Sequence, residues 1–325
     1  MTFKPPTVQR HTLPRVLVVD PLASDALEAL RRVYDVTVQM QPAEDELAVL
    51  LRQTDAIVLR SGVKLPGHLI ADAPDLKVIA RAGNGTDNID LAAARSAGVQ
   101  VFNVPGVSSP AVAELALGLA FSVARHIAAA DRQVRANVWR KADLVGSELC
   151  GKTMGVVGLG SIGSRVAELA RGIGMSVIAS ARRRDDERRE ACRRSGIDLR
   201  STEEVLAQAD VVVLACPLND HTRGLIDADA LRLMKSTAFL VNVARGGVVD
   251  EDALRVALLE GVIAGAALDV HAAERAPSGL AGLDNVVLTP HIGAMTRDSQ
   301  ERIGQLLLEG IRLALSGRDA PTRVC

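Results

Sequence analysis

The feature that most constrains the fold of this chain is the alternation of short apolar segments with helix-like ones. Segments such as RVLVVD at 15–20, AIVLR at 56–60 and DVVVLA at 210–215 are almost continuously apolar, which is typical of strands buried on both faces of a sheet. The other expected strands lie at 76–81, 99–103, 153–158, 175–179, 238–243, 263–268 and 285–289, and helices are expected at 24–33, 44–51, 90–97 and 161–172. This pattern predicts an α/β protein with parallel sheets covered by helices, and right-handed crossovers make such sheets doubly wound.

The chain is long enough for two domains. Its 325 residues exceed what one hydrophobic core usually serves, and 48% of them are hydrophobic. Two segments that contain proline and glycine follow expected strands, at 104–106 and 289–293, and long helical patterns at 110–130 and 296–316 come after them. We therefore expect one domain from residues 1–104 and 294–325, with a second domain, residues 105–293, inserted into it.

Composition and charge exclude several classes of function. Aromatic residues make up 2% of the chain and the formal net charge is -1, so we expect neither a nucleic-acid surface nor binding to an anionic membrane. The cysteines, Cys150, Cys192, Cys216 and Cys325, have no C-x-x-C spacing, which indicates no metal site and a reducing, cytoplasmic location. Residues 1–14 lack the apolar stretch of a signal peptide, and the longest apolar stretch, 115–124, predicts a buried helix.

A glycine motif marks a dinucleotide site. Residues 158–163 read Gly158-Leu159-Gly160-Ser161-Ile162-Gly163, a G-x-G-x-x-G that follows an expected strand and opens an expected helix. The first glycine permits a tight turn, the second lets the backbone approach a pyrophosphate, and the third lets the helix pack on the strand. The N-terminus of this helix offers unpaired N–H groups to the phosphates.

The residues after the next strand favour the phosphorylated form of the cofactor. In NAD-binding proteins an acid at this strand end bonds the adenosine ribose, but here Ser180 and Ala181 are followed by Arg182, Arg183 and Arg184. Arginine forms charge-assisted bonds with a 2′-phosphate, which an acid would repel. We therefore expect NADP to be preferred, with Arg182 and Arg183 as contacts. The alternative is that the cofactor is NAD and that these arginines are solvated side chains at the start of a helix.

Polar residues at the carboxyl ends of three expected strands predict a catalytic site, because open α/β sheets bind ligands at that edge. Arg245 lies in 242–247, Asp269 ends the strand before Glu274, and His291 lies in 289–293. Hydride transfer to a 2-keto acid leaves negative charge on the former carbonyl oxygen, and a histidine can supply the proton near neutral pH. A carboxylate such as Glu274 favours the imidazolium of His291, and Arg245 can fork onto a substrate carboxylate and polarise the carbonyl.

With these motifs the sequence resembles the D-isomer-specific 2-hydroxyacid dehydrogenase family over nearly the whole chain. The resemblance rests on Arg60-Ser61, RAGNGTDNID at 81–90, Val112-Ala113-Glu114, the glycine motif, Pro217-Leu218, and the segments 242–247, 265–270 and 289–293. Trp139-Arg140-Lys141 and GSELCGKT at 146–153 make it most similar to the branch of 3-phosphoglycerate dehydrogenases and glyoxylate/hydroxypyruvate reductases. It implies a flavodoxin-like substrate-binding domain at 1–104 and 294–325, and a Rossmann NAD(P)-binding domain at 105–293.

The resemblance also implies roles for individual residues. Backbone N–H groups at Asn84 and Gly85 would hold the substrate carboxylate beside Ser61, and Arg245 would pair with that carboxylate and the carbonyl oxygen. Glu274 would hold His291, the acid/base. Cys216 and Pro217 would border the adenosine, and Asp269 would contact the nicotinamide carboxamide. The other cofactor contacts that it implies are Gly158, Gly160, Ser161, Ile162, Gly163, Thr222, Val243, Ala244, His291 and Gly293.

Family members are usually homodimers joined through their nucleotide-binding domains, with the helix at 110–130 prominent, so a homodimer is expected. Some positions depart from the usual pattern: His271 stands for a phenylalanine, Arg275 for a proline, Ser108 for an asparagine and Ala181 for the ribose acid. The chain ends at Cys325, and we expect no regulatory domain of the kind found on long phosphoglycerate dehydrogenases.

We therefore predict an NAD(P)-dependent oxidoreductase that transfers a hydride between a nicotinamide cofactor and a small D-2-hydroxy or 2-keto acid, similar to glyoxylate/hydroxypyruvate reductases. A short D-3-phosphoglycerate dehydrogenase is the alternative within this class, with Arg60 and Lys141 as candidate ligands of the substrate phosphate. A dinucleotide-sensing binding protein similar to corepressors is the alternative outside it, and a turnover assay separates it from an enzyme.

Overall fold

The structure is a computed structural model of the chain, and it describes residues 13–183, 185–274 and 278–325. Contacts divide the chain into two compact units. Unit 1 is Met1–Val107 with Arg297–Cys325, and unit 2 is Ser108–Thr296.

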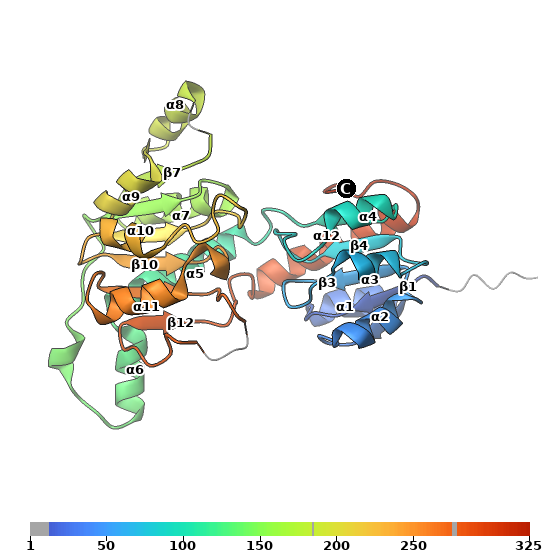
Figure 1. Cartoon of the computed structure of the whole chain (residues 1–325), viewed down its shortest axis with the longest axis horizontal. Coiled ribbons are helices and arrows are strands. Elements are labelled where there is room, and N and C mark those ends of the chain that lie inside the picture. The colour runs from blue at the N-terminus through green and yellow to red at the C-terminus, as the bar shows by residue number, and fades with distance from the viewer. Residues whose placement is uncertain (1–12, 184, 275–277) are drawn as a thin grey trace, which may run out of the picture. The chain divides into compact units, whose positions relative to one another are not determined.

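Unit 1 contains a five-stranded parallel sheet (Figure 1) with the order β2-β1-β3-β4-β5. This order is the flavodoxin-like one. Its strands are β1 (Arg15–Val18), β2 (Asp35–Val38), β3 (Ala56–Leu59), β4 (Val78–Arg81) and β5 (Gln100–Asn103), and its helices are α1 (Ser24–Arg31), α2 (Glu44–Leu51), α3 (Gly67–Ala71), α4 (Leu91–Ser96) and α12 (Arg297–Leu315).

Alternate residues of the unit 1 strands enter two separate cores. Leu17, Ile57 and Ile79 belong to a buried cluster with residues of α2, α3 and α4, whereas Val16, Val18 and other strand residues belong to a cluster with α1 and α12. The period of two in a strand sends neighbours to opposite faces, so helices cover both faces of this sheet.

Unit 2 contains a seven-stranded parallel sheet with the order β12-β11-β10-β9-β6-β7-β8. Its strands are β6 (Thr153–Val157), β7 (Ser176–Ser180), β8 (Ile197–Leu199), β9 (Val211–Leu214), β10 (Phe239–Asn242), β11 (Gly265–Leu268) and β12 (Val286–Leu288). Its helices are α5 (Ser109–Ala124), α6 (Ile127–Arg135), η1 (Lys141–Leu144), α7 (Ser161–Gly172), α8 (Asp186–Arg194), α9 (Thr202–Gln208), α10 (Ala228–Leu233), η2 (Gly246–Val248) and α11 (Glu251–Leu259).

Two buried layers enclose the unit 2 sheet. One cluster joins strand residues with α5 and α7, and the other joins them with α9, α10 and α11. The strand order reverses between β6 and β9, and this switch point is where doubly wound sheets bind dinucleotides. The predicted fold class, two doubly wound parallel sheets of flavodoxin-like and Rossmann type, is therefore confirmed.

One predicted helix is wrong in detail. The apolar pattern at 110–130 predicted a single helix, but α5 ends at Ala124 and α6 begins at Ile127. His126 between them has a left-handed φ of 52°, which interrupts the helical hydrogen bonds. In the described residues no single helix is long and apolar enough to cross a bilayer. Only α5 and α6 taken together reach that length and composition, and they are bent by 64° at the break.

Candidate active site

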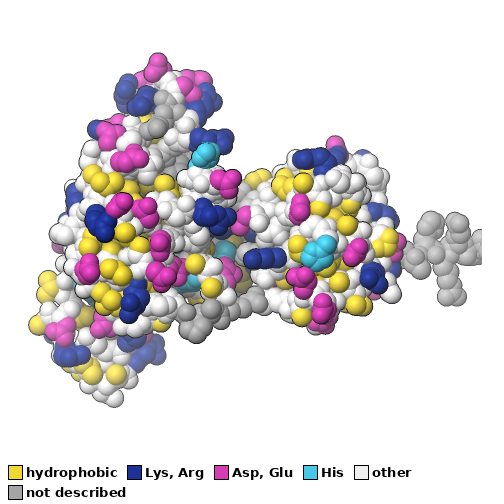
Figure 2. All heavy atoms as spheres, viewed as in Figure 1, with side chains coloured by type: hydrophobic (Ala, Val, Ile, Leu, Met, Phe, Trp, Pro, Cys, Tyr) yellow, Lys and Arg dark blue, Asp and Glu magenta, His cyan; other side chains and the backbone are white. Residues whose placement is uncertain are grey.

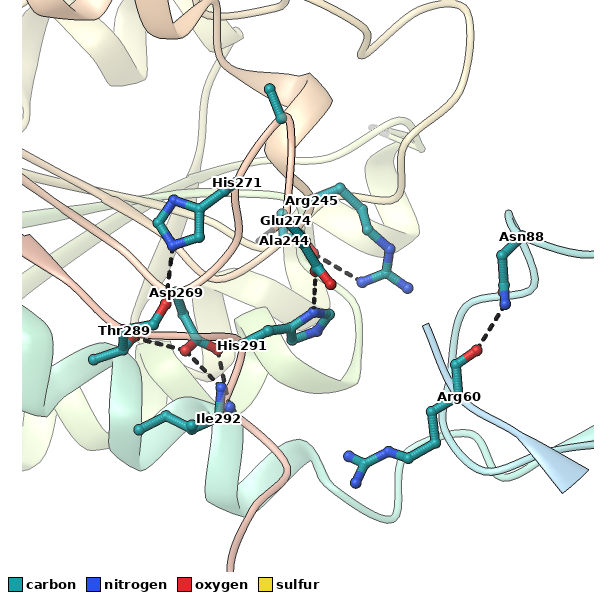
Figure 3. Close-up of polar contacts among 12 residues, drawn as sticks. Arg60, Asn88, Ala244, Arg245, Asp269, His271, Glu274, Thr289, His291 and Ile292 are labelled. Carbon is teal, nitrogen blue, oxygen red and sulfur yellow. Dashed lines mark hydrogen bonds and ion pairs between the residues drawn. The ribbon is translucent and has the colours of Figure 1, made fainter. Parts of the chain in front are cut away.

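His291 and Glu274 form a close pair in unit 2 (Figure 3). His291 Nδ1 lies 2.6 Å from Glu274 Oε1, and both side chains are partly exposed. Glu274 follows β11 and His291 follows β12, which are neighbouring strands, so the parallel sheet brings together residues 17 positions apart. An ionised carboxylate only accepts hydrogen bonds, so Nδ1 carries the proton and Nε2 is the nitrogen suited to exchange one.

A buried carboxylate holds the backbone that carries His291. Asp269 is 2% exposed. Its Oδ1 accepts bonds from the Thr289 hydroxyl at 2.7 Å and from the Ile292 N–H at 2.8 Å, and its Oδ2 accepts one from the Gly293 N–H at 2.9 Å. The His291 N–H in turn donates to the Asp269 carbonyl at 2.8 Å. These bonds keep His291 in a left-handed conformation with φ 56°, which is costly for a residue other than glycine.

His271 links the loop that contains Gly246 with the loop that contains Thr289 in unit 2, and the sequence gives no sign of this role. Its Nε2 donates to the Thr289 carbonyl at 2.9 Å, while its buried Nδ1 has no hydrogen-bond partner among the described residues. The backbone of His271 also lies against Gly246, where an added Cβ would meet the His271 carbonyl carbon at 2.0 Å. The sequence marks His271 only as an unusual residue, because both of its contacts come from distant segments.

Arg245 follows β10, the strand next to β11, and Figure 3 shows it with the residues around His291. Its Nη1 donates to the Ala244 carbonyl at 2.8 Å. Asn242, with 0% of its surface exposed, accepts a bond from the Ala244 N–H and donates one to the Arg245 carbonyl, each at 3.0 Å. This buried amide fixes the turn that presents Arg245. The role of Asn242 could have been predicted, because it is a polar residue that ends an otherwise apolar strand.

The glycine motif has the geometry of a pyrophosphate cradle. Gly158 has φ 99°, and an added Cβ on Gly163 would lie 2.0 Å from the Gly158 carbonyl oxygen. An added Cβ on Gly160 would meet nothing within 4 Å, so the space above this residue is open. Gly160 is the N-cap of α7 and no side chain caps the helix. Ser161 and Ile162 form the first turn, whose N–H groups are therefore suited to an anion.

The residues that we expect to border the adenosine are partly buried. Cys216 is 9% exposed, and burial raises the pKa of its thiol to about 11. The Thr222 hydroxyl donates to the Pro217 carbonyl at 2.5 Å and so closes the loop after β9. Val243 and Ala244, which follow β10, are also buried. A protonated, apolar Cys216 is compatible with the flat face of an adenine.

The arginines after β7 differ in their surroundings. Arg182 and Arg183 are exposed, and Arg183 pairs with Asp185 and, at 2.9 Å, with Glu187. Arg184 lies outside the described residues. Arg188 on α8 is only half-exposed and donates to the Leu159 carbonyl in the glycine motif at 2.8 Å. The sequence does not single out Arg188, because nothing in a charged helical run distinguishes it from its neighbours.

The expected substrate residues of unit 1 lie on two connected loops. Asn88 donates to the carbonyls of Arg60 and Val63, at 2.7 and 2.6 Å, and so holds the loop that contains Ser61. Asn84 and Gly85 follow β4, and Asn103 donates to the Asn84 carbonyl at 2.6 Å. Described His, Cys, Asp and Glu side chains form no group of three or more that could hold a metal ion.

Comparisons with known proteins agree with this geometry. Residues 117–293 match the family model described as D-isomer specific 2-hydroxyacid dehydrogenase, NAD binding domain. The chain is 40% identical over 302 residues to a hydroxypyruvate reductase of Thermotoga maritima, which covers 91% of this chain and 97% of that protein. It is also 40% identical over 314 residues to a D-3-phosphoglycerate dehydrogenase of Mycobacterium tuberculosis, and this match covers 96% of the chain but 59% of that longer protein.

A solved structure shows the same architecture. It is an NADPH-dependent glyoxylate/hydroxypyruvate reductase from Sinorhizobium meliloti in complex with NADP and malonate, with a TM-score of 0.84 and 28% identity. The alignment covers 97% of each chain.

Proposed function

This chain belongs to the D-isomer specific 2-hydroxyacid dehydrogenase family, and we propose that it transfers a hydride between a nicotinamide cofactor and a small D-2-hydroxy or 2-keto acid. The observation that carries the proposal is the 2.6 Å contact of His291 with Glu274, in the same unit as a glycine turn shaped for a pyrophosphate. A nicotinamide supplies or accepts the hydride at C2 of the substrate. The residues of the chain bind the acid and move the proton.

Each proposed catalytic residue has one task. Glu274 keeps the proton on His291 Nδ1, so that Nε2 gives a proton to the C2 oxygen during reduction and takes it back during oxidation. Arg245 pairs with the substrate carboxylate and stabilises the charge that develops on the C2 oxygen. Ser61 and the N–H groups of Asn84 and Gly85 bind the carboxylate.

We assign the cofactor, together with Arg245, Glu274 and His291, to a domain of residues 105–293. The other proposed contacts of the substrate carboxylate, Ser61, Asn84 and Gly85, belong to a domain of residues 1–104 and 294–325. The match of 117–293 to an NAD binding domain supports the first assignment. Gly158, Gly160, Ser161, Ile162 and Gly163 would hold the pyrophosphate. The remaining proposed cofactor contacts are Arg182, Arg183, Cys216, Pro217, Thr222, Val243, Ala244, Asp269, His291 and Gly293.

NADP is the preferred cofactor in this proposal. Ala181 stands where a carboxylate would bond the ribose of NAD, and arginines follow it. The reductase from Sinorhizobium meliloti, described as NADPH-dependent, supports the same preference. We also place the protein in the cytoplasm, because its four cysteines are free thiols, and we propose that it is a homodimer.

D-3-phosphoglycerate dehydrogenase is the second candidate activity. Several relatives near 40% identity carry that name, and Arg60 and Lys141 are the candidate cationic ligands of a substrate phosphate. Arg60 is held by its N–H bond to Asp20 at 2.6 Å, and burial lowers the pKa of its guanidinium while Asp20 opposes that shift. Lys141 is exposed at the start of η1.

The test is a substrate panel. The purified full chain is assayed with glyoxylate, hydroxypyruvate, pyruvate, phenylpyruvate and 3-phosphohydroxypyruvate, each with NADPH and NADH. We expect turnover that is fastest with a small unphosphorylated keto acid and NADPH. Fastest turnover of 3-phosphohydroxypyruvate would select the second candidate, and no oxidation of either cofactor with any acid would favour a dinucleotide sensor.

His291→Asn provides the matched control. We expect kcat to fall by about 100-fold or more while the Kd of NADPH changes little, since the variant lacks a group that titrates near neutral pH. Turnover that survives this change across the pH range would exclude His291 as the acid/base.

A further inference from the structure

The arginines around α8 are mostly compensated by carboxylates of the same region. Figure 2 shows this end of unit 2 as a mixture of positive and negative side chains. Arg183 pairs with Asp185 and Glu187, and Arg193 pairs with Glu190 at 2.7 Å. Arg200, which follows β8, pairs with Asp198 at 2.7 Å. An arginine held in this way must give up or share a partner before it can bind another anion.

Arg188 differs in two respects from Arg183 and Arg193, the arginines that form such pairs next to it. It is half-exposed, whereas Arg182, Arg183, Arg189, Arg193 and Arg194 are exposed. Within the described parts of the chain it forms no ion pair, and its side chain makes one hydrogen bond, from Nη2 to the Leu159 carbonyl at 2.8 Å. A guanidinium has five N–H donors, so most of its hydrogen-bonding capacity and its full charge are available to a ligand.

The position of this guanidinium is fixed by local structure. Asp185 caps α8 by accepting a bond from the Arg188 N–H at 2.9 Å, which places Arg188 in the first turn. The bond to Leu159 then draws the side chain to the glycine motif. In the same motif the Gly158 N–H donates to the Ser180 carbonyl at 2.9 Å. Arg188 therefore reaches the place where the glycine turn meets the end of β7, which is where Rossmann domains bind the adenosine ribose.

We propose that Arg188 binds the 2′-phosphate of NADP and is the main determinant of cofactor preference in this protein. The inference rests on the proposed NADP-dependent function and goes beyond it, because it assigns the leading role to a helix residue and leaves Arg182 and Arg183 as supporting contacts. A phosphate dianion gains charge-assisted bonds from a guanidinium, whereas the 2′-hydroxyl of NAD gains only a weaker neutral one. The preference thus comes from a guanidinium that is anchored on the glycine turn and forms no ion pair with a described residue. Arg182 likewise forms no ion pair with a described residue, but it is exposed and has no such contact with the glycine turn there.

The competing explanation is that Arg188 is a clamp that only stabilises the glycine turn. A clamp would support NADPH and NADH equally, since both place a pyrophosphate on that turn. The ratio of the two affinities therefore separates the explanations, and a change in thermal stability alone does not.

The experiment measures the Kd of NADPH and NADH by fluorescence titration for the full chain and for Arg188→Ala, Arg188→Met and Arg193→Ala. Arg188→Met keeps an apolar side chain of similar length if the alanine variant folds poorly. Arg193→Ala is the matched control, because it removes an arginine of the same helix that pairs with Glu190. Adenosine 2′,5′-bisphosphate and AMP, as competitors, test the phosphate separately from the nicotinamide.

We expect both Arg188 variants to raise the Kd of NADPH and of adenosine 2′,5′-bisphosphate by about 10-fold or more, with less than about 2-fold change for NADH and AMP. Equal weakening of NADPH and NADH would overturn the proposal in favour of the clamp. A wild-type protein that prefers NADPH, and keeps that preference in both variants, would leave the proposed function intact and exclude Arg188. Equal wild-type affinities for the two cofactors would instead contradict the NADP preference itself.

Discussion

At the scale of single residues, Asp269 shows how one buried carboxylate can fix the loop that carries His291, the proposed acid/base. Its carboxylate accepts three hydrogen bonds from residues 289, 292 and 293, which flank His291 on both sides. An asparagine could not accept the same set, because its NH₂ group would face a donor. The loop would lose the restraint that keeps His291 in its left-handed conformation.

We predict that Asp269→Asn lowers the free energy of unfolding of the cofactor-free protein by about 2 kcal/mol and lowers kcat by about 10-fold or more. Urea unfolding and steady-state kinetics measure the two effects. Thr289→Val, which removes one of the three bonds, serves as the graded control and should cost about 1 kcal/mol. Unchanged stability of Asp269→Asn in the absence of cofactor would show that Asp269 acts on the ligand alone.

Sequence reasoning could find Asp269 but not this structural role. A polar residue at the carboxyl end of an apolar strand is conspicuous, and so are Arg245 and His291 for the same reason. The hydrogen-bond partners of Asp269 lie 20 to 24 positions away, and no local pattern reveals which of its oxygens they contact. Arg188 and His271 were missed because their contacts are equally distant in the sequence.

At the scale of secondary-structure elements, an aspartate aligns neighbouring central strands in each of the two units. Asp55, just before β3, accepts a bond from the Arg15 N–H that begins β1 at 2.9 Å and pairs with Lys77 at 3.0 Å. In unit 2, Asp210 precedes β9, accepts a bond from the Thr153 N–H that begins β6 at 2.9 Å and pairs with Lys235 at 2.8 Å. In each sheet a carboxylate ties the starts of neighbouring strands.

Both carboxylates have pKa values below the ordinary 3.8. Burial would raise the pKa of Asp55, but its bonds from the Arg15 N–H and Lys77 outweigh burial. Burial likewise opposes the bonds of Asp210 with Lys235 and the Thr153 N–H, which leave its pKa lowered. Because these folded-state values lie below the unfolded ones, the stabilisation is fully present above about pH 4 and is lost as the pH falls through the folded pKa values.

We predict that Asp55→Asn and Asp210→Asn each lower the free energy of unfolding by about 1–2 kcal/mol at pH 7. Urea titrations at pH 7 and pH 3 should show the difference from wild type shrinking at the lower pH, because the stabilisation by these carboxylates declines as the pH falls toward their lowered folded-state pKa values. Asp229→Asn, in an exposed pair with Arg232, is expected to change stability by less than about 0.5 kcal/mol. A difference that is equal at both pH values would mean that charge is not the stabilising factor.

The sequence predicted the strands whose residues are buried, and it missed short or weakly buried strands. The central strands β3 and β9 were expected from continuous apolar runs, and their residues are buried throughout. The edge strands β2 and β8 were not expected, because β2 has no buried residue and β8 has only three residues. The break between α5 and α6 also went unseen, since neither proline nor glycine marks it and His126 alone adopts the left-handed conformation.

At the scale of the whole molecule, the order in which the expected strands and helices follow one another predicted most of the fold. Parallel strands place their carboxyl ends at one edge, so Arg245, Glu274 and His291 could be expected together in unit 2 once the strands were recognised. The insertion of one unit into the other followed from two segments with proline and glycine and the long helical patterns after them. The sequence could not show which apolar side chains are exposed. Such exposed side chains indicate where another protein chain binds.

The segment that begins with α6 exposes several large apolar side chains. None of the residues of α6 is buried, although the helix carries Ile127 at 52% exposure and Val134 at 49%. Trp139 at 72% and Val145 at 80% continue this apolar surface along the chain. Exposed large apolar residues concentrated in one segment are typical of a protein interface.

We predict that a second copy of the chain covers this surface, so that sedimentation velocity gives a mass about twice the 34.3 kDa of the chain. Val134→Asp together with Val145→Asp should shift the protein to monomer, because dimerisation would bury the charge of each new aspartate in the interface. Val49→Asp is the matched control, since Val49 is 67% exposed on α2 of unit 1 and lies outside the proposed interface. A wild-type monomer at micromolar concentration, or a dimer that survives both aspartates, would require another explanation for a helix with no buried residue.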